Sequence, residues 1–168
     1  MATIHTIKIP AGVNIAQEDG RITVSGPRGV VRREMQYPGI TIACDGRECT
    51  VGTASRRKDL IAMCGTFAAH IRNMCRGVTE GYEYRMKVVY SHFPIQLKVV
   101  GDRVEINNFL GEKKPRYATI REGVKVAVGN DEVVISGIDK ESVGNTAASI
   151  ERATKIRYRD PRVFQDGI

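Results

Sequence analysis

The chain has 168 residues, 42% of them apolar and 27% charged, and its 26 Lys and Arg against 19 Asp and Glu give a net charge of +7. This length fits one domain or two small ones with a real core, and the positive charge favours a polyanionic partner such as nucleic acid. No apolar run reaches the roughly 18–20 residues that cross a bilayer, and no signal-peptide pattern opens the chain, so we expect an intracellular protein without a membrane partner.

Two segments of the chain repeat one another, residues 20–52 and residues 102–136. Inside them, ITIACDGRECTV at 40–51 aligns with VKVAVGNDEVVI at 124–135, at a constant offset of 84 residues and without a gap. Each stretch alternates β-type residues around a four-residue turn that contains Gly. This pattern predicts a hairpin in both copies.

The first hairpin carries two of the four cysteines. Cys44 and Cys49 flank its turn and align with Val128 and Val133 in the second copy. We therefore expect an apolar cross-strand pair of free thiols, which is the default state inside cells. No CxxC motif occurs and no His stands at ligand spacing from a Cys pair, so we predict no metal site.

A helix is predicted after the first hairpin, over residues 55–78. Its apolar residues recur at i, i+3 and i+4 and make one broad apolar stripe. Ser55 is the expected N-cap, and Gly77 is the expected C-terminal stop. Cys64 and Cys75 share this stripe about 16 Å apart along the helix axis, so we expect both to be small core residues.

A second helix is predicted over residues 139–156, with Asp139 or Ser142 as its cap. The sequence therefore predicts an α+β fold of two tandem duplicated domains, each a small, mostly antiparallel sheet packed with one main helix. The expected domains are residues 1–81 and 82–168. They carry 11 basic and 7 acidic residues and then 15 and 12, or +4 and +3, so the positive charge lies in local clusters rather than in one tail.

The residues needed for catalysis are not arranged for it. The three histidines are His5, His70 and His92, and a nucleophile–base pair of Cys64 with His70 would lie roughly 120° apart around a helix. The GPRG stretch at 26–29 lacks the GxxxxGK[ST] spacing of a phosphate-binding loop and fits a β-turn. We predict no catalytic residues, no cofactor and no small-molecule substrate.

Four basic clusters carry the functional signal: Arg28 with Arg32 and Arg33; Arg56, Arg57 and Lys58; Lys113, Lys114, Arg116 and Arg121; Lys155, Arg157, Arg159 and Arg162. A single cluster of this kind is as compatible with a solvated face as with a binding site. The second cluster stands at a helix N-terminus, where the macrodipole disfavours cations and an anion would compensate. In the fourth, Tyr158 lies between alternate cations, so it faces away from them or stacks on a base.

The loop NNFLGEKKPR, residues 107–116, combines apolar groups with cations. A membrane-surface tip, a nucleotide-binding loop, an RNA contact and a charged β-turn are the alternatives. At an offset of 82, Gly111 matches Gly29, so the stretch is the second copy of VSGPRGVVRR, a strand, turn and strand. This removes the membrane and nucleotide alternatives. Phe109 and Leu110 are expected to pack under the turn or against RNA, and both possibilities stay open.

Several motifs together carry a family resemblance: RMKVVYSHFPI at 85–95, VEINNFLGEKKPR at 104–116, HIRNMCRGVTEGY at 70–82, RVFQDGI at 162–168 and TVSGPRG at 23–29. In this order and spacing, over essentially the whole chain, they resemble the large-subunit ribosomal protein six family in its eukaryotic and archaeal form. The family has two similar α+β domains, which agrees with the repeat.

The resemblance implies a non-catalytic constituent of the large ribosomal subunit in the cytoplasm. It implies binding to large-subunit ribosomal RNA near the stalk base and the sarcin–ricin region, with residues 82–168 as the main anchor. It also implies that other large-subunit proteins are neighbours and that translation factors dock close by. A basic RNA-binding or adaptor module outside the ribosome is the alternative. The residues expected to contact RNA are Arg28, Arg56, Arg57, Lys58, Lys113, Lys114, Arg116, Arg121, Lys155, Arg157, Tyr158, Arg159 and Arg162.

Overall fold

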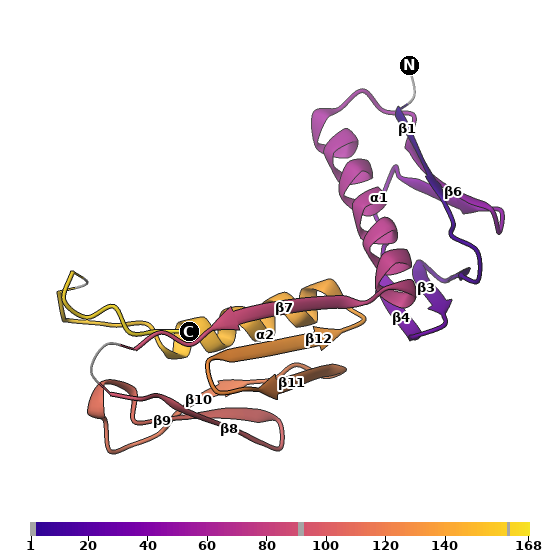
Figure 1. Ribbon diagram of the computed structural model, residues 1–168. Helices are drawn as coiled ribbons and strands as arrows, with labels where there is room; N and C mark the ends of the chain where they lie inside the picture. The colour runs from indigo at the N-terminus through magenta and orange to yellow at the C-terminus, as the bar shows by residue number, and fades with distance from the viewer. Residues whose placement is uncertain (1–2, 91–92, 161) are drawn as a thin grey trace. The chain divides into compact units, whose positions relative to one another are not determined.

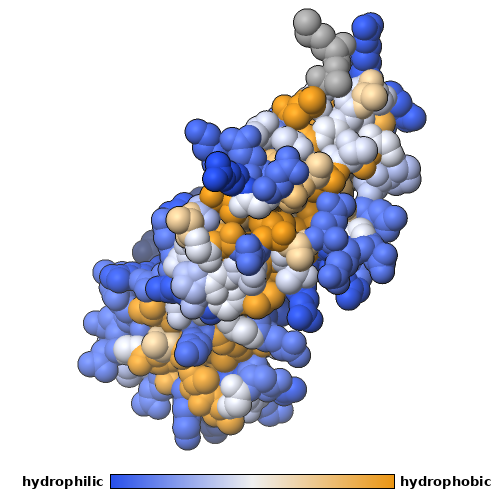
Figure 2. Space-filling view, turned by 90° about the vertical axis from the view of Figure 1, so that its right-hand side faces the viewer, coloured by the Kyte–Doolittle hydropathy of each residue, from blue (hydrophilic) through white to orange (hydrophobic). Residues whose placement is uncertain are grey.

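The computed structural model describes residues 3–90, 93–160 and 162–168, so His92 lies outside the described residues. The chain forms two compact units, Met1–Gly81 and Tyr82–Ile168 (Figure 1). On the face drawn in Figure 2, hydrophobic side chains are interspersed among hydrophilic ones. Each unit has its own buried core of apolar side chains.

The first unit contains two three-stranded antiparallel sheets, β1-β6-β5 and β2-β3-β4, and one long helix. Helix α1 packs on β1, β3 and β6, and its apolar stripe closes a core in which Ile22, Val24, Val51, Ile71 and Val78 have no exposed surface. The elements are β1 (Thr3–Lys8), β2 (Asn14–Glu18), β3 (Arg21–Gly26), β4 (Gly29–Glu34), β5 (Thr41–Cys44), β6 (Glu48–Thr53) and α1 (Lys58–Thr79).

The second unit repeats this plan with the sheets β11-β12-β7 and β10-β9-β8. Helix α2 lies alongside β7 and β12 and also contacts β10 (Figure 1). The α+β fold class and its duplication are thus confirmed. The elements are β7 (Tyr82–Lys87), β8 (Gln96–Val100), β9 (Arg103–Asn107), the 3₁₀ turn η1 (Phe109–Gly111), β10 (Arg116–Thr119), β11 (Val124–Val128), β12 (Glu132–Gly137) and α2 (Lys140–Ala153).

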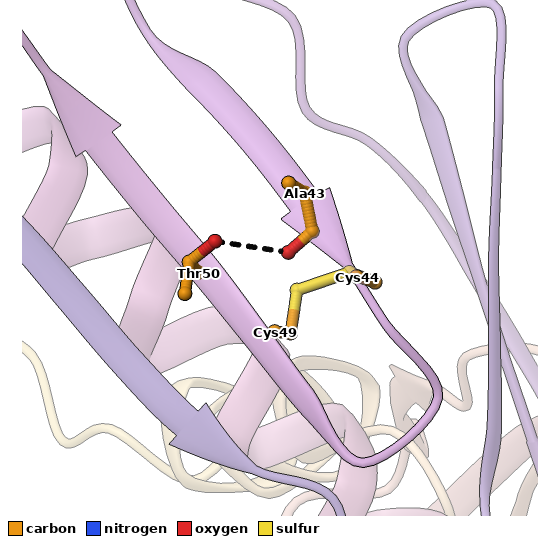
Figure 3. Close-up of a disulfide and its surroundings, with 4 residues drawn as sticks. All are labelled: Ala43, Cys44, Cys49 and Thr50. Carbon is orange, nitrogen blue, oxygen red and sulfur yellow. Dashed lines mark hydrogen bonds between the residues drawn. A yellow bond between two sulfur atoms is a disulfide. The ribbon is translucent and has the colours of Figure 1, made fainter.

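The repeated hairpins are β5–β6 and β11–β12, and their registers agree residue by residue. Cys44 lies opposite Cys49, and Val128 lies opposite Val133, as the cross-strand pairing predicted. The prediction of free thiols is wrong for the first pair, which forms a disulfide beside the hydrogen bond from Thr50 to Ala43 (Figure 3). The register explains this, because it holds the two Cα atoms 4.1 Å apart. The expectation rests on the alignment with Val128 and Val133 and on the reducing interior of cells, and neither prevents two facing thiols from pairing.

The two helices begin differently. Asp139 is the N-cap of α2, and its carboxylate accepts hydrogen bonds from the backbone N–H groups of Glu141 and Ser142 at 3.4 and 3.1 Å. The N-cap of α1 is Arg57, which makes no side-chain cap. Ser55 was the predicted cap, but it lies two residues too early, and its Oγ accepts from the N–H of Arg57 in a local turn.

The helix ends also correct the predicted boundaries. Gly77 is buried inside the last turn of α1 and does not stop the helix. The chain leaves the helical conformation at Gly81, whose φ of +82° suits glycine and whose N–H donates to the carbonyl of Arg76 at 3.3 Å. Helix α2 ends at Ala153, so Ile156 lies beyond the helix, although it still packs against the core.

Candidate nucleic-acid interface

Arg116 joins two segments that are far apart in the sequence, the loop 108–115 and the stretch 154–160 after α2. Its Nε and Nη2 donate to the two carboxylate oxygens of Glu112 at 2.8 and 2.6 Å. Its Nη1 donates to the carbonyls of Ala153 and Lys155 at 2.8 and 3.3 Å. We call this set of contacts, together with the stacking of the guanidinium on Phe109, the Arg116 latch.

The loop that presents Glu112 is built on a buried aromatic ring. The side chain of Phe109 is 1% exposed, so it belongs to the core and does not face a partner. The Arg116 guanidinium carbon lies 4.4 Å from the centre of this ring, in cation–π geometry. Asn108 and Leu110 both have positive φ, 59° and 52°, and the Asn108 amide donates to the carbonyl of Pro94 at 3.1 Å.

The stretch after α2 is anchored at both ends. At its start, the buried Thr154 accepts a hydrogen bond at Oγ1 from the N–H of Ile168. After it, Val89 and Gly167 exchange two backbone hydrogen bonds of 2.8 Å. Between these anchors, Tyr158 has a positive φ of 59°.

A basic pocket of about 420 Å³ opens between the two joined segments. Arg152, in the last turn of α2, belongs to this pocket but not to any cluster found in the sequence. It lies one helical turn before Lys155, so its spacing was a usable signal. The lining residues are Leu110, Glu112, Arg116, Arg152, Ala153, Lys155, Arg157, Tyr158 and Arg159.

The pocket carries five cations and one carboxylate. The hydrogen bond from Arg116 lowers the pKa of Glu112 against the opposing effect of burial, and the nearby charges of Arg116 and Arg159 lower it further. Glu112 is therefore ionised and offsets Arg116. The remaining four cations, Arg152, Lys155, Arg157 and Arg159, give the pocket the chemistry of a phosphate site.

The other predicted residues of the second unit lie outside this pocket. Lys113 and Lys114 are exposed on the loop between η1 and β10, next to the latch in sequence. Arg121 is exposed just after β10, and its backbone N–H donates to Thr146 Oγ1 at 3.2 Å. Arg162 is exposed near the C-terminal end of the chain.

The predicted cations of the first unit lie at separate places in the fold. Residues 56–58 are exposed at the start of α1, where Arg57 pairs with Asp59 at 3.2 Å. Arg28 stands in the β3–β4 turn with its guanidinium against Gly81. These positions suit separate phosphate contacts rather than one enclosed site.

The two thiols and the histidine of α1 have structural surroundings. Cys64 and Cys75 are buried, and burial raises the pKa of both thiols. The Nδ1 atom of His70 lies 3.1 Å from the guanidinium of Arg33. Within residues 3–90, 93–160 and 162–168 there is no group of three or more His, Cys, Asp and Glu side chains that would hold a metal, and no helix has the length and apolar character of a membrane span.

Comparison with known proteins places the whole chain. The family described as "Ribosomal protein L6" matches residues 9–81 and 93–167, one match for each unit. The "Large ribosomal subunit protein uL6" of Methanospirillum hungatei is 56% identical over 168 residues, covering 100% of this chain and 96% of that protein. Proteins of the same name from Methanothrix thermoacetophila and Methanosarcina mazei are each 52% identical, covering 98% of this chain and 94% and 93% of theirs. The resemblance carried by the motifs is confirmed, and the chain belongs to the ribosomal protein L6 family.

Proposed function

We propose that this protein is a non-enzymatic component of the large ribosomal subunit in the cytoplasm. In this proposal it binds large-subunit ribosomal RNA near the stalk base and the sarcin–ricin region, beside neighbouring large-subunit proteins and close to where translation factors dock. The second unit is the main anchor. The observation that supports it most is the basic pocket, in which four cations besides Arg116 line a cavity whose two walls Arg116 joins.

The predicted RNA contacts then divide into three roles. Lys155, Arg157 and Arg159 bind phosphate in the pocket, and Tyr158 stands beside them. Arg116 acts indirectly, by holding both walls of the pocket together. The remaining cations bind phosphates outside the pocket: Lys113, Lys114, Arg121 and Arg162 in the second unit, and Arg28, Arg56, Arg57 and Lys58 in the first.

Sedimentation of cell extracts tests the assignment to the ribosome. We expect the protein to co-sediment with large subunits and to leave them only at high salt, because phosphate contacts weaken as counterions compete. Recovery of the protein only in soluble fractions at moderate salt would favour the alternative, an RNA-binding or adaptor module that works outside the ribosome.

The salt dependence of RNA binding tests the site. Each phosphate contact contributes about 0.9 to the slope of log affinity against log salt on duplex, so Lys113→Gln with Lys114→Gln is expected to flatten the slope by about one to two units. The matched control is Lys98→Gln with Lys125→Gln, which removes the same charge from exposed positions on β8 and β11. An equal change in both double variants would show that net charge, and not these two positions, determines binding.

A further inference from the structure

We propose that the basic pocket receives one unpaired nucleotide, with its phosphate among the four cations and its base stacked on Tyr158. This inference rests on the proposed function, because it names which part of an RNA the pocket recognises. It adds two statements to that function: Arg152 is a phosphate ligand, and the site distinguishes an unpaired nucleotide from a continuous duplex.

Tyr158 is presented as a stacking platform. Its relative exposure is 103%, whereas the other exposed tyrosines of the second unit, Tyr84, Tyr90 and Tyr117, are 39–56% exposed. Its φ of 59° lies in the left-handed region, which an aromatic residue rarely adopts. A strained conformation that leaves both ring faces uncovered contributes nothing to this unit's core, and it is typical of a binding residue.

Contacts of the neighbouring residues hold the chain on both sides of Tyr158. Arg159 stacks over the ring of Phe164 at 4.8 Å. Immediately beyond, the carbonyl of Asp160 accepts from the N–H groups of Val163 and Phe164 at 3.2 and 3.0 Å. On the other side, the latch holds the carbonyl of Lys155. These contacts order the chain that flanks Tyr158 before RNA arrives, which limits the backbone entropy lost on binding.

The pocket has the size and charge for one nucleotide. Its volume of about 420 Å³ falls near the lower end of the range for small-ligand sites, roughly 300–1,000 Å³. Arg152, Lys155 and Arg157 line the same cavity as Tyr158. Phosphate and base of one nucleotide can thus be bound together.

This combination selects against paired RNA. In an A-form helix the phosphates are accessible, but the bases are stacked on one another, so an aromatic side chain has no base face to meet. An unpaired nucleotide in a bulge or loop offers both groups at once. Stacking tolerates any base, so we expect a preference for an unpaired position rather than for a sequence.

The test compares two hairpin RNAs that differ only by one bulged nucleotide, titrated with the full-length protein at low salt. The wild type is expected to bind the bulged RNA about 5- to 150-fold more tightly, the range for one base–aromatic stack. Tyr158→Ala should abolish the preference and Tyr158→Phe should keep it. Tyr117→Ala, which removes an exposed tyrosine from β10, is the matched control.

Arg152→Gln should reduce the salt slope for the bulged RNA by about 0.7–0.9.

Each outcome decides between the inference and the proposed function. Equal affinity of the wild type for both RNAs would overturn the inference, and so would a preference that survives Tyr158→Ala. Failure to bind either RNA at low salt would overturn the proposed function instead. Hydrogen exchange of β9, β10 and α2 confirms that every variant keeps the fold, so a loss of binding can be assigned to the substituted side chain.

Discussion

The two units carry the same strand–turn–strand, and the second copy has been extended. In the first unit, Val24 pairs with Val31, and the six residues 25–30 connect them. In the second, the equivalent Ile106 pairs with Arg116, and the nine residues 107–115 connect them. The connection is therefore three residues longer in the second copy, and the offset of 82 that matches Gly111 with Gly29 does not continue into β10.

This difference shows how a duplicated fold acquires a site in one copy only. Val31 packs against the core of the first unit, whereas Arg116 occupies its register position and reaches out to the chain after α2. The strands and the helix keep their places because a hairpin connection tolerates insertion. The first copy has its own addition, the Cys44–Cys49 disulfide, where the second keeps two valines.

Breaking the latch is expected to have the largest effect. Arg116→Met removes four hydrogen bonds and the stacking on Phe109, and it leaves Glu112 without its cation. Hydrogen bonds to charged groups contribute about 1.5–3 kcal/mol each, and solvent screening reduces this for a partly exposed pair, so we expect a loss of about 2–3 kcal/mol. Hydrogen exchange of the amides in β10 and α2 measures it, and the first unit should be unchanged.

Arg85→Met is the matched control for the latch, because the pair of Arg85 with Glu83 is exposed, at 70% and 49%. Its loss is expected to be much smaller than that of Arg116→Met, because solvent screens an exposed ion pair. If Arg116→Met cost no more than Arg85→Met, the latch would be an ordinary surface ion pair, and the pocket would owe its shape to the rest of the fold.

The disulfide is expected to have the next largest effect, this time in the first unit. The Cys44–Cys49 bond closes a loop with a sequence separation of 5. The chain-entropy estimate for so short a loop is about 2 kcal/mol. Reduction of the disulfide should therefore lower the free energy of hydrogen-exchange protection of the β5 and β6 amides by about 2 kcal/mol. The protection of the β11 and β12 amides should not change.

Exchanging the Cys44–Cys49 pair and the Val128–Val133 pair tests how alike the two hairpins are. Cys44→Val with Cys49→Val copies the second hairpin into the first, and it should behave like the reduced protein with the packing retained. Val128→Cys with Val133→Cys should form a disulfide and stabilise the second unit by up to about 2 kcal/mol, because the registers agree. Failure of the second variant to oxidise would mean that the two hairpins are less alike than their registers indicate.

Local patterns were sufficient for most of the fold. Alternation around a Gly-containing turn located both hairpins, and i, i+3, i+4 spacing located both helices. The cap at Asp139 was also predictable, because its contacts lie within three residues. Helix ends are less accurate: the sequence predicts a stop at Gly77, but this residue is buried against the core, and α1 continues to Thr79, just before the positive φ at Gly81.

The site depended on contacts that no local pattern encodes. Arg116 was grouped with phosphate-binding cations, yet its guanidinium donates to groups as distant in sequence as Lys155. The spacing of Arg152 to Lys155 is a local signal, but the return of the chain after α2 is what places Arg152 in one pocket with Arg157. For Phe109, core and RNA contact were equally consistent with the sequence, and burial decides for the core.

The contrast between the helix N-termini predicts effects of about 1 kcal/mol in opposite directions. Asp139→Ala should destabilise the second unit by about that amount, because two N–H groups lose their acceptor. Arg57→Asp should stabilise the first unit by up to about 1 kcal/mol, since Arg57 has the extended backbone of an N-cap but no capping side chain. Thermal unfolding with unit-resolved hydrogen exchange measures both.

Arg57→Asp is also expected to weaken RNA binding, because it replaces a predicted phosphate contact by a like charge. A variant that is more stable and binds less would show that the missing cap is retained for function. If Arg57→Asp left both stability and binding unchanged, neither the cap nor the contact would be at this residue.

Acidification is expected to have the smallest effect on stability. The effect should appear in the second unit, which contains Glu112, and not in the first. The hydrogen bond from Arg116 lowers the pKa of Glu112 in the folded protein, so the unfolded chain takes up this proton more readily. The stability from the pair is therefore fully present above the ordinary Glu pKa of about 4.3 and is lost as pH falls through the lowered folded value. We expect a loss of less than about 1 kcal/mol below about pH 4, because the two side chains are 27% and 37% exposed.

The variant Glu112→Gln isolates this contribution. It should be less stable than the wild type at neutral pH and should lose less stability on acidification, because the group that titrates has been removed. The latch amides in β10 report the change, and the hairpin β5–β6 is the internal reference for carboxylates elsewhere. If the β10 amides of the variant and of the wild type lost equal protection on acidification, Glu112 would not be the group that links this site to pH. The Arg116 latch would then depend on the two backbone carbonyls and the Phe109 ring.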